Sequence, residues 1–192
     1  MGGSLGSACE EWEARLQFLT DHGAHTRGHS QGALLDHLRE VHDLLQSWGA
    51  PEFLCDAGLF HSVYGTESFR HVTIPLELRP QVERLIGEKA ESLAYHFGVM
   101  DHGSFALNRD LRAGFSITHR FSGETIPLDP DEWANLCELF VANALEQLPR
   151  VAPDRRLSFF QRFSWVGNHL SPPARAHLVA CSAEFSFPSD ET

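Results

Sequence analysis

The chain has 192 residues, enough for one domain with a sizeable hydrophobic core. Apolar residues make up 42% of the sequence and aromatic residues 10%, a composition that excludes an intrinsically disordered protein. The formal net charge of −11 argues against sequence-independent binding to nucleic acid or anionic lipid, since both need a basic surface.

Helical spacing of apolar residues marks the first part of the chain. Residues 8–20 carry apolar side chains at this spacing. The clearest helix is expected from Ser30, as its N-cap, to Trp48. Residues 51–60 are expected to form a shorter helix. The apolar side chains of the clearest helix fall on one buried face: Leu34, Leu38, Val41, Leu45 and Trp48.

Further helices and one hairpin follow. Residues 79–97 are expected to form one or two helices around Gly87. Residues 115–128 alternate around a Ser-Gly pair and predict a small β-hairpin. Asp129, followed by Pro130 and three positions later by Glu132, predicts a helix start. That helix is expected to bury Trp133, Leu136, Cys137, Phe140 and Ala144. A final helix is expected from near 171. The fold class is therefore all-α, with a single mostly helical domain over residues 1–192.

Cellular setting and partners follow from what the sequence lacks. No apolar run approaches the roughly 18 residues of a membrane span. The first residues turn acidic and lack the basic and apolar regions of a signal peptide. The four cysteines form no CxxC pair, so neither a zinc knuckle nor a disulfide framework is indicated. We expect a cytoplasmic protein without a membrane or nucleic-acid partner, whose oligomeric state the sequence leaves open.

Histidines are the candidate functional residues, and the sequence has 12 of them. His37 lies between Leu34 and Val41 on the apolar face, and His61 ends the short helix. A lone inward histidine is typically a hydrogen-bonded core residue, whereas two on consecutive helices are typical of a metal site. His29 falls about 80° round the expected helix from His37, so it is either a third ligand or a solvated side chain.

The stretch AGLFHSVYG, residues 57–65, leaves two interpretations of His61 open. The short apolar helix could hold the imidazole against a cavity whose mouth is lined by residues 63–66. Gly65 would then permit a backbone angle that other residues avoid, and Tyr64 would place a hydroxyl at the rim. Alternatively, His61 caps the C-terminus of its helix, where a positive charge suits the helix dipole.

The spacing of 24 residues between His37 and His61 carries a family resemblance. The segment HLREVHDLLQSWGAPEFLCDAGLFHS resembles the first two motifs of HD-domain metal-dependent phosphohydrolases, particularly the RelA/SpoT type that removes pyrophosphate from ppGpp. Residues 82–97 and 139–148 resemble two later helices of that group. The resemblance therefore covers residues 30–148 in order. The pattern AGLFHS-x-YGT also resembles a bacterial family whose biochemical role the resemblance does not supply.

This resemblance implies an HD-domain-like helical bundle that holds a divalent metal ion, Mn, Fe or Zn. His37, His61 and Asn143 match the positions of its ligands, and His29 is an additional candidate. Two aspartates of the family are replaced, by Ser62 and by Asn143. Neutral ligands bind a divalent ion less tightly than carboxylates do. Either substitutes are recruited, or the site no longer binds metal and Asn143 is a core amide. The candidate substitutes are His29, Glu67, His71 and Asp101.

Three functions are compatible with these residues. The first is a metal-dependent hydrolase of a small phosphate-containing metabolite or nucleotide, in which the ion activates a water molecule and Tyr64 and Glu67 assist proton transfer. The second is an iron oxygenase, because the resemblance extends to HD-fold relatives with a di-iron site. The third is a non-catalytic module that binds a small molecule or has a structural role. Metal content separates the third from the other two.

Overall fold

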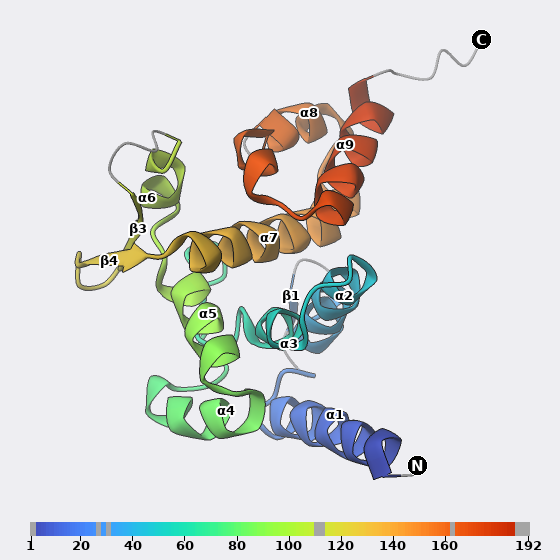
Figure 1. The fold of residues 1–192 in the computed structure, drawn as a ribbon, viewed down its shortest axis with the longest axis vertical. Coiled ribbons are helices and arrows are strands. Elements are labelled where there is room, and N and C mark those ends of the chain that lie inside the picture. The colour runs from blue at the N-terminus through green and yellow to red at the C-terminus, as the bar shows by residue number, and fades with distance from the viewer. Residues whose placement is uncertain (1–2, 26–27, 30–31, 110–113, 162–163, 187–192) are drawn as a thin grey trace.

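Helix α7, Pro130–Gln147, crosses the middle of the computed structural model, and the other helices pack on its two sides (Figure 1). The structure describes residues 3–25, 28–29, 32–109, 114–161 and 164–186. On one side of α7 lie α2, Leu34–Ser47, and α3, Glu52–Phe60, with α1, Gly3–Asp21, beyond them. On the other side lie α8, Pro153–Gln161, η4, Ser164–His169, and α9, Pro172–Ser186.

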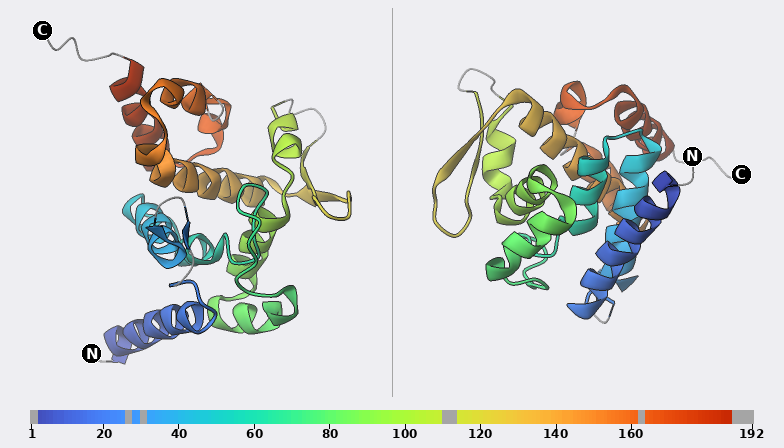
Figure 2. Two further views of the ribbon diagram at one scale, coloured as in Figure 1. Left: turned by 180° about the vertical axis from the view of Figure 1, so that it is seen from behind. Right: turned by 60° about the horizontal axis from the view of Figure 1, so that its bottom comes forward.

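The middle of the chain supplies the remaining elements. The short helix η1, Leu76–Leu78, leads into α4, Arg79–Ile86, and α5, Glu88–Val99, and α5 packs against both α3 and α7. Helix α6, His102–Leu107, precedes the antiparallel strands β3, Phe115–Thr118, and β4, Thr125–Leu128. The short helix η3, Leu148–Arg150, continues α7. Figure 2 shows the hairpin projecting from one end of the molecule.

This arrangement confirms the mostly helical fold with a small β-hairpin. The expected break at Gly87 is present, since its φ of 84° separates α4 from α5. Helix α6 was not expected. Asp101 caps it by accepting a hydrogen bond from the backbone N–H of Ser104 at 2.7 Å. No helix within the described part of the chain is long and apolar enough to cross a membrane.

The start of α2 differs from expectation. The helix begins at Leu34, and Ser30, the expected N-cap, lies outside the described residues. The two-residue strands β1, Gly28–His29, and β2, Gly32–Ala33, pair antiparallel just before the helix. The prediction of a helix beginning at Ser30 is therefore wrong. Glycines weaken a helix because they have more backbone freedom to lose, and here the two strands contain two glycines.

The start of α7 is fixed by side-chain hydrogen bonds, as the sequence predicts. The Asp129 carboxylate accepts from the backbone N–H groups of Asp131 and Glu132, each at 2.8 Å. In return, the Glu132 carboxylate accepts from the backbone N–H of Asp129 at 2.9 Å. This capping box satisfies N–H groups that have no partner within the helix. It also sets the register of every residue farther along α7.

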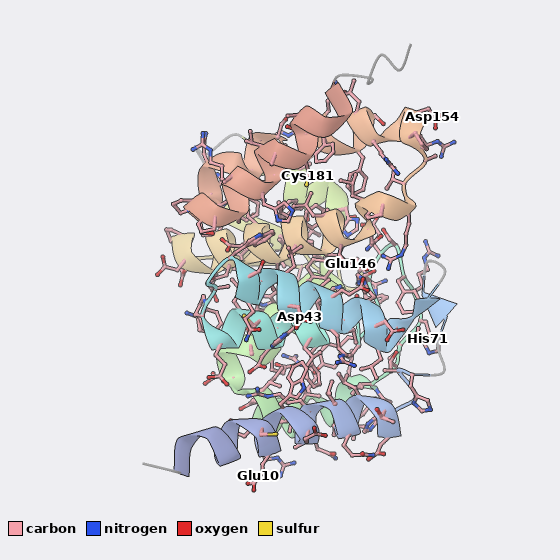
Figure 3. All side chains as sticks on the ribbon, turned by 90° about the vertical axis from the view of Figure 1, so that its right-hand side faces the viewer. Glu10, Asp43, His71, Glu146, Asp154 and Cys181 are labelled. Carbon is pink, nitrogen blue, oxygen red and sulfur yellow. The ribbon has the colours of Figure 1, made fainter. Side chains whose placement is uncertain are left out.

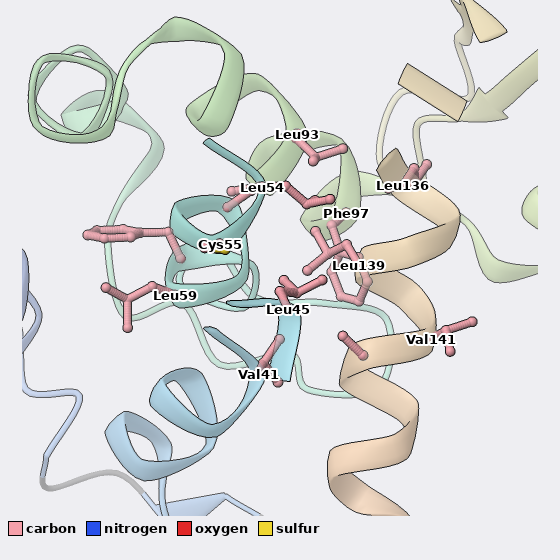
Figure 4. Packing of buried hydrophobic residues seen from close by; sticks show 14 of the residues in the cluster. Val41, Leu45, Leu54, Cys55, Leu59, Leu93, Phe97, Leu136, Leu139 and Val141 are labelled. Atoms are coloured by element: carbon pink, nitrogen blue, oxygen red, sulfur yellow. The ribbon is translucent and has the colours of Figure 1, made fainter. Parts of the chain in front are cut away.

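The hydrophobic core lies where α2, α3, α5 and α7 meet, and Figure 4 shows its centre around Leu45, Leu54, Phe97 and Leu139. The closest approach within it is between α2 and α3, at Gly58. A Cβ atom on Gly58 would lie only 2.6 Å from the Leu45 Cδ1 atom and 3.4 Å from a Val41 methyl carbon. Glycine at this position therefore allows the two helices to pack closely.

Substitution of Gly58 tests this contact. Gly58→Ala should lower the free energy of unfolding by about 1–3 kcal/mol, the usual cost of overpacking, because Leu45 and Val41 must move. Gly167→Ala is the matched control, since a Cβ atom there would meet no atom within 4 Å. Urea denaturation of both variants measures the difference. Equal effects of the two substitutions would contradict a close contact at Gly58.

A buried ion pair joins α1 to α3. Arg15 Nη2 lies 3.0 Å from Asp56 Oδ2, and the two side chains are 11% and 3% exposed. Burial raises the pKa of Asp56 to about 6, and the Arg15 charge opposes this effect only in part. The folded protein thus holds a proton on Asp56 at pH values where the unfolded chain has lost it.

Asp56 should therefore make stability depend on pH. Because its pKa is higher in the folded state, its contribution is complete below about pH 4 and is lost as the pH rises through about 6. The stability of the wild type relative to Asp56→Asn should fall by up to about 3 kcal/mol between pH 4 and pH 7. Denaturation of both proteins at the two pH values measures this difference. A difference that does not change with pH would show that burial has no such effect.

Candidate metal centre

His37 of α2 and His61, the C-cap residue of α3, face each other in the interior. Their Nε2 atoms lie 3.2 Å apart, and the rings meet edge to face with centroids 5.0 Å apart. The two residues are 2% and 0% exposed. The separation is well within the roughly 5 Å that a shared ion would allow, so the two imidazoles meet as expected for inward histidines on consecutive helices.

Hydrogen bonds at the Nδ1 atoms fix the tautomers of both rings. His61 Nδ1 donates to the carbonyl oxygen of Gly58 at 2.7 Å, and His37 Nδ1 donates to Glu146 Oε2 at 2.5 Å. A carbonyl and a carboxylate can only accept, so each Nδ1 carries a proton. In the neutral rings, both Nε2 atoms then present lone pairs toward each other. Lone pairs aimed at each other in this way are able to bind one cation between them.

Asn143 of α7 adds a third electron-pair donor. Its Oδ1 lies 3.1 Å from His61 Nε2 and accepts a hydrogen bond from Gln147 Nε2 at 2.9 Å. Donor atoms bonded to one ion at about 2.1 Å lie roughly 3 Å apart, which matches both separations from His61. Asn143 is partly buried, and both the ligand and the hydrogen-bonded amide remain compatible with these contacts.

Burial keeps His37 in its neutral form. Burial, followed by the charge of Arg150, lowers the pKa of His37 to about 4, while Glu40 and Asn143 act in the opposite direction. The Glu146 carboxylate that accepts from His37 Nδ1 is itself paired with Arg150, whose Nη1 contacts Glu146 Oε1. A neutral imidazole is the form that binds a metal ion.

Glu146 is the residue of this site that sequence patterns missed. Its side chain is only 3% exposed, and Arg150 links it to Glu40 of α2 through a 3.3 Å contact. Figure 3 shows Glu146 on α7 at the level of α2. One signal was available, because Glu146 follows Asn143 by three residues and therefore lies on the same helix face. Metal-bound histidines typically donate their second N–H to a carboxylate or carbonyl, as both rings do here.

The other predicted residues are placed differently. His29 lies in β1 rather than on the helix of His37, so the expected angle between them is wrong, and its side chain lies outside the described residues. Tyr64 is buried and donates to Glu91 Oε1 at 2.9 Å. Arg79 holds the same carboxylate with two hydrogen bonds. Burial and the Glu91 charge raise the pKa of Tyr64. Its hydroxyl is thus engaged in this buried network.

Two of the proposed substitutes for the missing aspartates, Glu67 and Asp101, serve α6 instead. The Glu67 carboxylate accepts from the backbone N–H of His102 at 2.6 Å, and Asp101 caps the same helix. Within the described ranges, no group of three His, Cys, Asp or Glu side chains could hold a metal ion. The set at the histidine pair is therefore two imidazoles and one amide.

The loop after His61 has the backbone that its sequence predicts. Gly65 has a φ of 74°, and a Cβ atom there would lie 3.2 Å from the carbonyl oxygen of His71. Both facts explain why glycine occupies the turn. His61 is the C-cap residue of α3, and its Nδ1 donates to a carbonyl of the last helical turn while its Nε2 faces His37.

A pocket of about 480 Å³ lies beside the pair. Ser62, which follows His61, and Asn143, which contacts it, both form part of the pocket wall. The wall continues with His102 and with Phe140, which is partly buried rather than a core residue as the helical spacing predicted. Asn143 is thus shared between the histidine pair and a cavity large enough for a small molecule.

Comparisons with known proteins do not assign a function. A family model described as a domain of unknown function, DUF6817, matches residues 18–102. This range is less than half of the chain and includes both histidines, but it ends before α7. Neither the curated proteins nor the solved structures contain a match. Inferences about function therefore depend on the geometry of the site.

The role of Glu146 can be tested by removing its charge. Glu146→Gln should weaken binding of Zn²⁺ or Co²⁺ by about 10–100-fold, because the carboxylate orients His37 and increases its basicity. Titration of the purified protein with Co²⁺, followed by its visible absorption, measures the affinity. Glu138→Gln is the matched control, since Glu138 is buried on the same helix but accepts hydrogen bonds from Ser171. If both variants lost affinity equally, Glu146 would act only through helix stability.

Proposed function

We propose that this protein is a metal-dependent hydrolase of a small phosphate-containing metabolite or nucleotide, with a divergent HD-domain site. His37, His61 and Asn143 would hold the ion. The observation that supports this most directly is the convergence of two imidazole lone pairs and an amide oxygen within 3.2 Å, beside a pocket. Two imidazole nitrogens and an amide oxygen at this spacing could bind one divalent ion.

The donor set suits particular ions. Imidazole nitrogens favour Zn²⁺ and Fe²⁺ over the harder Mg²⁺, with Mn²⁺ intermediate. Because all three ligands are neutral, a bound ion keeps its full charge of +2. This reduces the affinity for the ion but increases its attraction for a phosphate group. When bound, the ion would supply an acidified water molecule and an electrophile for the phosphoryl oxygens.

The chain itself would position the substrate. The Ser62 and Thr66 hydroxyls of the pocket wall can donate to phosphoryl oxygens, and apolar side chains exclude bulk water. In the hydrolysis, a water oxygen bonds to phosphorus, the bond from phosphorus to the leaving oxygen breaks, and that oxygen takes up a proton. Glu67 and His102 lie 3.6 Å apart, carboxylate to Nδ1, and His102 lines the pocket. In this proposal, the pair rather than Tyr64 would exchange protons there.

The setting of the reaction is part of the proposal. All four cysteines, which lie in the described part of the chain, are free thiols, and this supports a cytoplasmic location. The net charge of −11 supports a small-molecule partner rather than nucleic acid. No separate observation favours an iron oxygenase or a non-catalytic module, so these remain outcomes of the experiment below.

Metal content and phosphate release test the proposal together. Protein purified without a His-tag should contain close to one Zn, Fe or Mn per chain by elemental analysis and should release phosphate from a panel of phosphate esters. His61→Gln should lose both properties, while its free energy of unfolding changes by about 1 kcal/mol. His42→Gln on α2 is the control, because His42 contacts Asp43 and not the pair.

Other outcomes would contradict the proposal in distinct ways. Protein that contains no metal, gains none on incubation and releases no phosphate would be a non-catalytic module. Bound iron that changes oxidation state and consumes oxygen would identify an oxygenase. Metal content that His61→Gln leaves unchanged would place the ion elsewhere in the protein.

A further inference from the structure

The pocket beside the histidine pair has an unusually aromatic wall. Two of its rings, Phe105 and Phe140, stack with centroids 4.6 Å apart and an interplanar angle of 26°. Aromatic side chains that border a cavity offer flat faces to a ligand, and ring pairs of this kind contribute beyond their buried area. Five phenylalanines line the pocket: Phe69, Phe97, Phe105, Phe140 and Phe159.

The polar part of the wall is electrically neutral. Hydroxyls of Ser62, Thr66 and Ser68 and amides of Asn143 and Gln147 provide it. Among the described residues that line the pocket, there is no Lys, Arg, Asp or Glu, and His102 is the one titratable side chain. Phosphate-rich ligands are normally bound by Arg, Lys or a cradle of backbone N–H groups. The described pocket wall has hydrogen-bonding groups that suit one polar end of a ligand. It lacks the Lys or Arg side chains that would neutralise several phosphates.

The net charge of the whole chain also disfavours a ligand with several phosphate groups. With a formal net charge of −11, the protein repels polyanions at long range. The candidate ion, at the Asn143 side of the pocket, would be a compact positive charge that can neutralise one phosphate group. A ligand with two or more additional phosphates would leave charges without partners in a partly apolar pocket.

We infer that the pocket takes a ligand with a flat aromatic ring and at most one phosphate group. The ring lies among the phenylalanines, and the polar end lies toward Ser62 and Asn143. The cleavage of such a ligand rests on the function proposed above, whereas its binding rests on the pocket alone. The inferred substrate class is therefore an aromatic phosphate monoester, and polyphosphates are excluded.

Three probes of different shape and charge test this inference. They are 1-naphthyl phosphate, glycerol 2-phosphate and ATP, each measured by calorimetry with full-length protein containing its metal. We expect 1-naphthyl phosphate to bind up to about tenfold more tightly than glycerol 2-phosphate, because one aromatic contact contributes up to about 1.5 kcal/mol. ATP should bind no more tightly than 1-naphthyl phosphate. Tighter binding of ATP, or equal binding of glycerol 2-phosphate, would overturn the inference.

Substitution of single phenylalanines of the pocket wall tests whether they contact the aromatic ring of the ligand. Phe140→Leu and Phe159→Leu keep apolar volume but remove a ring face, so each should reduce the preference for 1-naphthyl phosphate over glycerol 2-phosphate by about three- to tenfold. Two variants are used because Phe140 also stacks on Phe105 in the fold. Phe53→Leu is the control, since Phe53 lies outside this pocket and contacts Lys89. An unchanged preference in both pocket variants would overturn the inference.

Binding of 1-naphthol, which carries no phosphate, separates this inference from the proposed hydrolase. Cleavage of 1-naphthyl phosphate adds water across the phosphorus–oxygen bond and yields 1-naphthol and inorganic phosphate. Saturable 1-naphthol binding that the phenylalanine variants weaken, without any turnover of the ester, would support the aromatic pocket and refute the hydrolase. Turnover of glycerol 2-phosphate and 1-naphthyl phosphate at equal efficiency would support the hydrolase and refute the aromatic preference.

Discussion

The close packing of α2 against α3 at Gly58 is the constraint on which the candidate site depends. Because a side chain at Gly58 would overlap Leu45, only glycine lets the two helices approach this closely. The same residue gives its carbonyl oxygen to His61 Nδ1, which turns the other ring nitrogen toward His37. One glycine thus determines both the separation of the two helices and the orientation of one imidazole.

Helix α7 completes the site from the other side. Its capping box fixes where the helix begins, and Asn143 and Glu146 then face α2 and α3 within a single turn. The two oxygens of the buried Glu146 carboxylate each have a partner, the His37 ring and Arg150. This neutral, hydrogen-bonded surrounding holds both rings as electron-pair donors. The ion proposed above would be held there by the two Nε2 atoms without a carboxylate ligand.

The pocket wall and the proposed ion would contribute different properties to ligand binding. The pocket wall is neutral and largely aromatic, whereas a cation at the pair would be a local charge at one end of the cavity. The Tyr64–Glu91–Arg79 network, by contrast, is a buried link between the loop after α3 and helices α4 and α5. It stabilises the loop that carries Ser62 and Thr66, and it does so without exposing an ionised group to the pocket.

Local signals in the sequence determined most of the helices and the hairpin, since apolar spacing, caps and glycines act over a few residues, whereas α6 was missed. The inward positions of His37 and His61 were readable in the same way, but the packing of α2 on α3 brings the two rings together. The sequence did not predict where α2 begins or that His29 lies in a strand. Strands β1 and β2 occupy the residues where the helix was expected to start. The tertiary structure alone decided that Glu146 contacts His37 and that Tyr64 turns to Glu91. Partners of buried polar groups come from elements far apart in the chain, and only packing shows which charges lose their water and which side chains replace it.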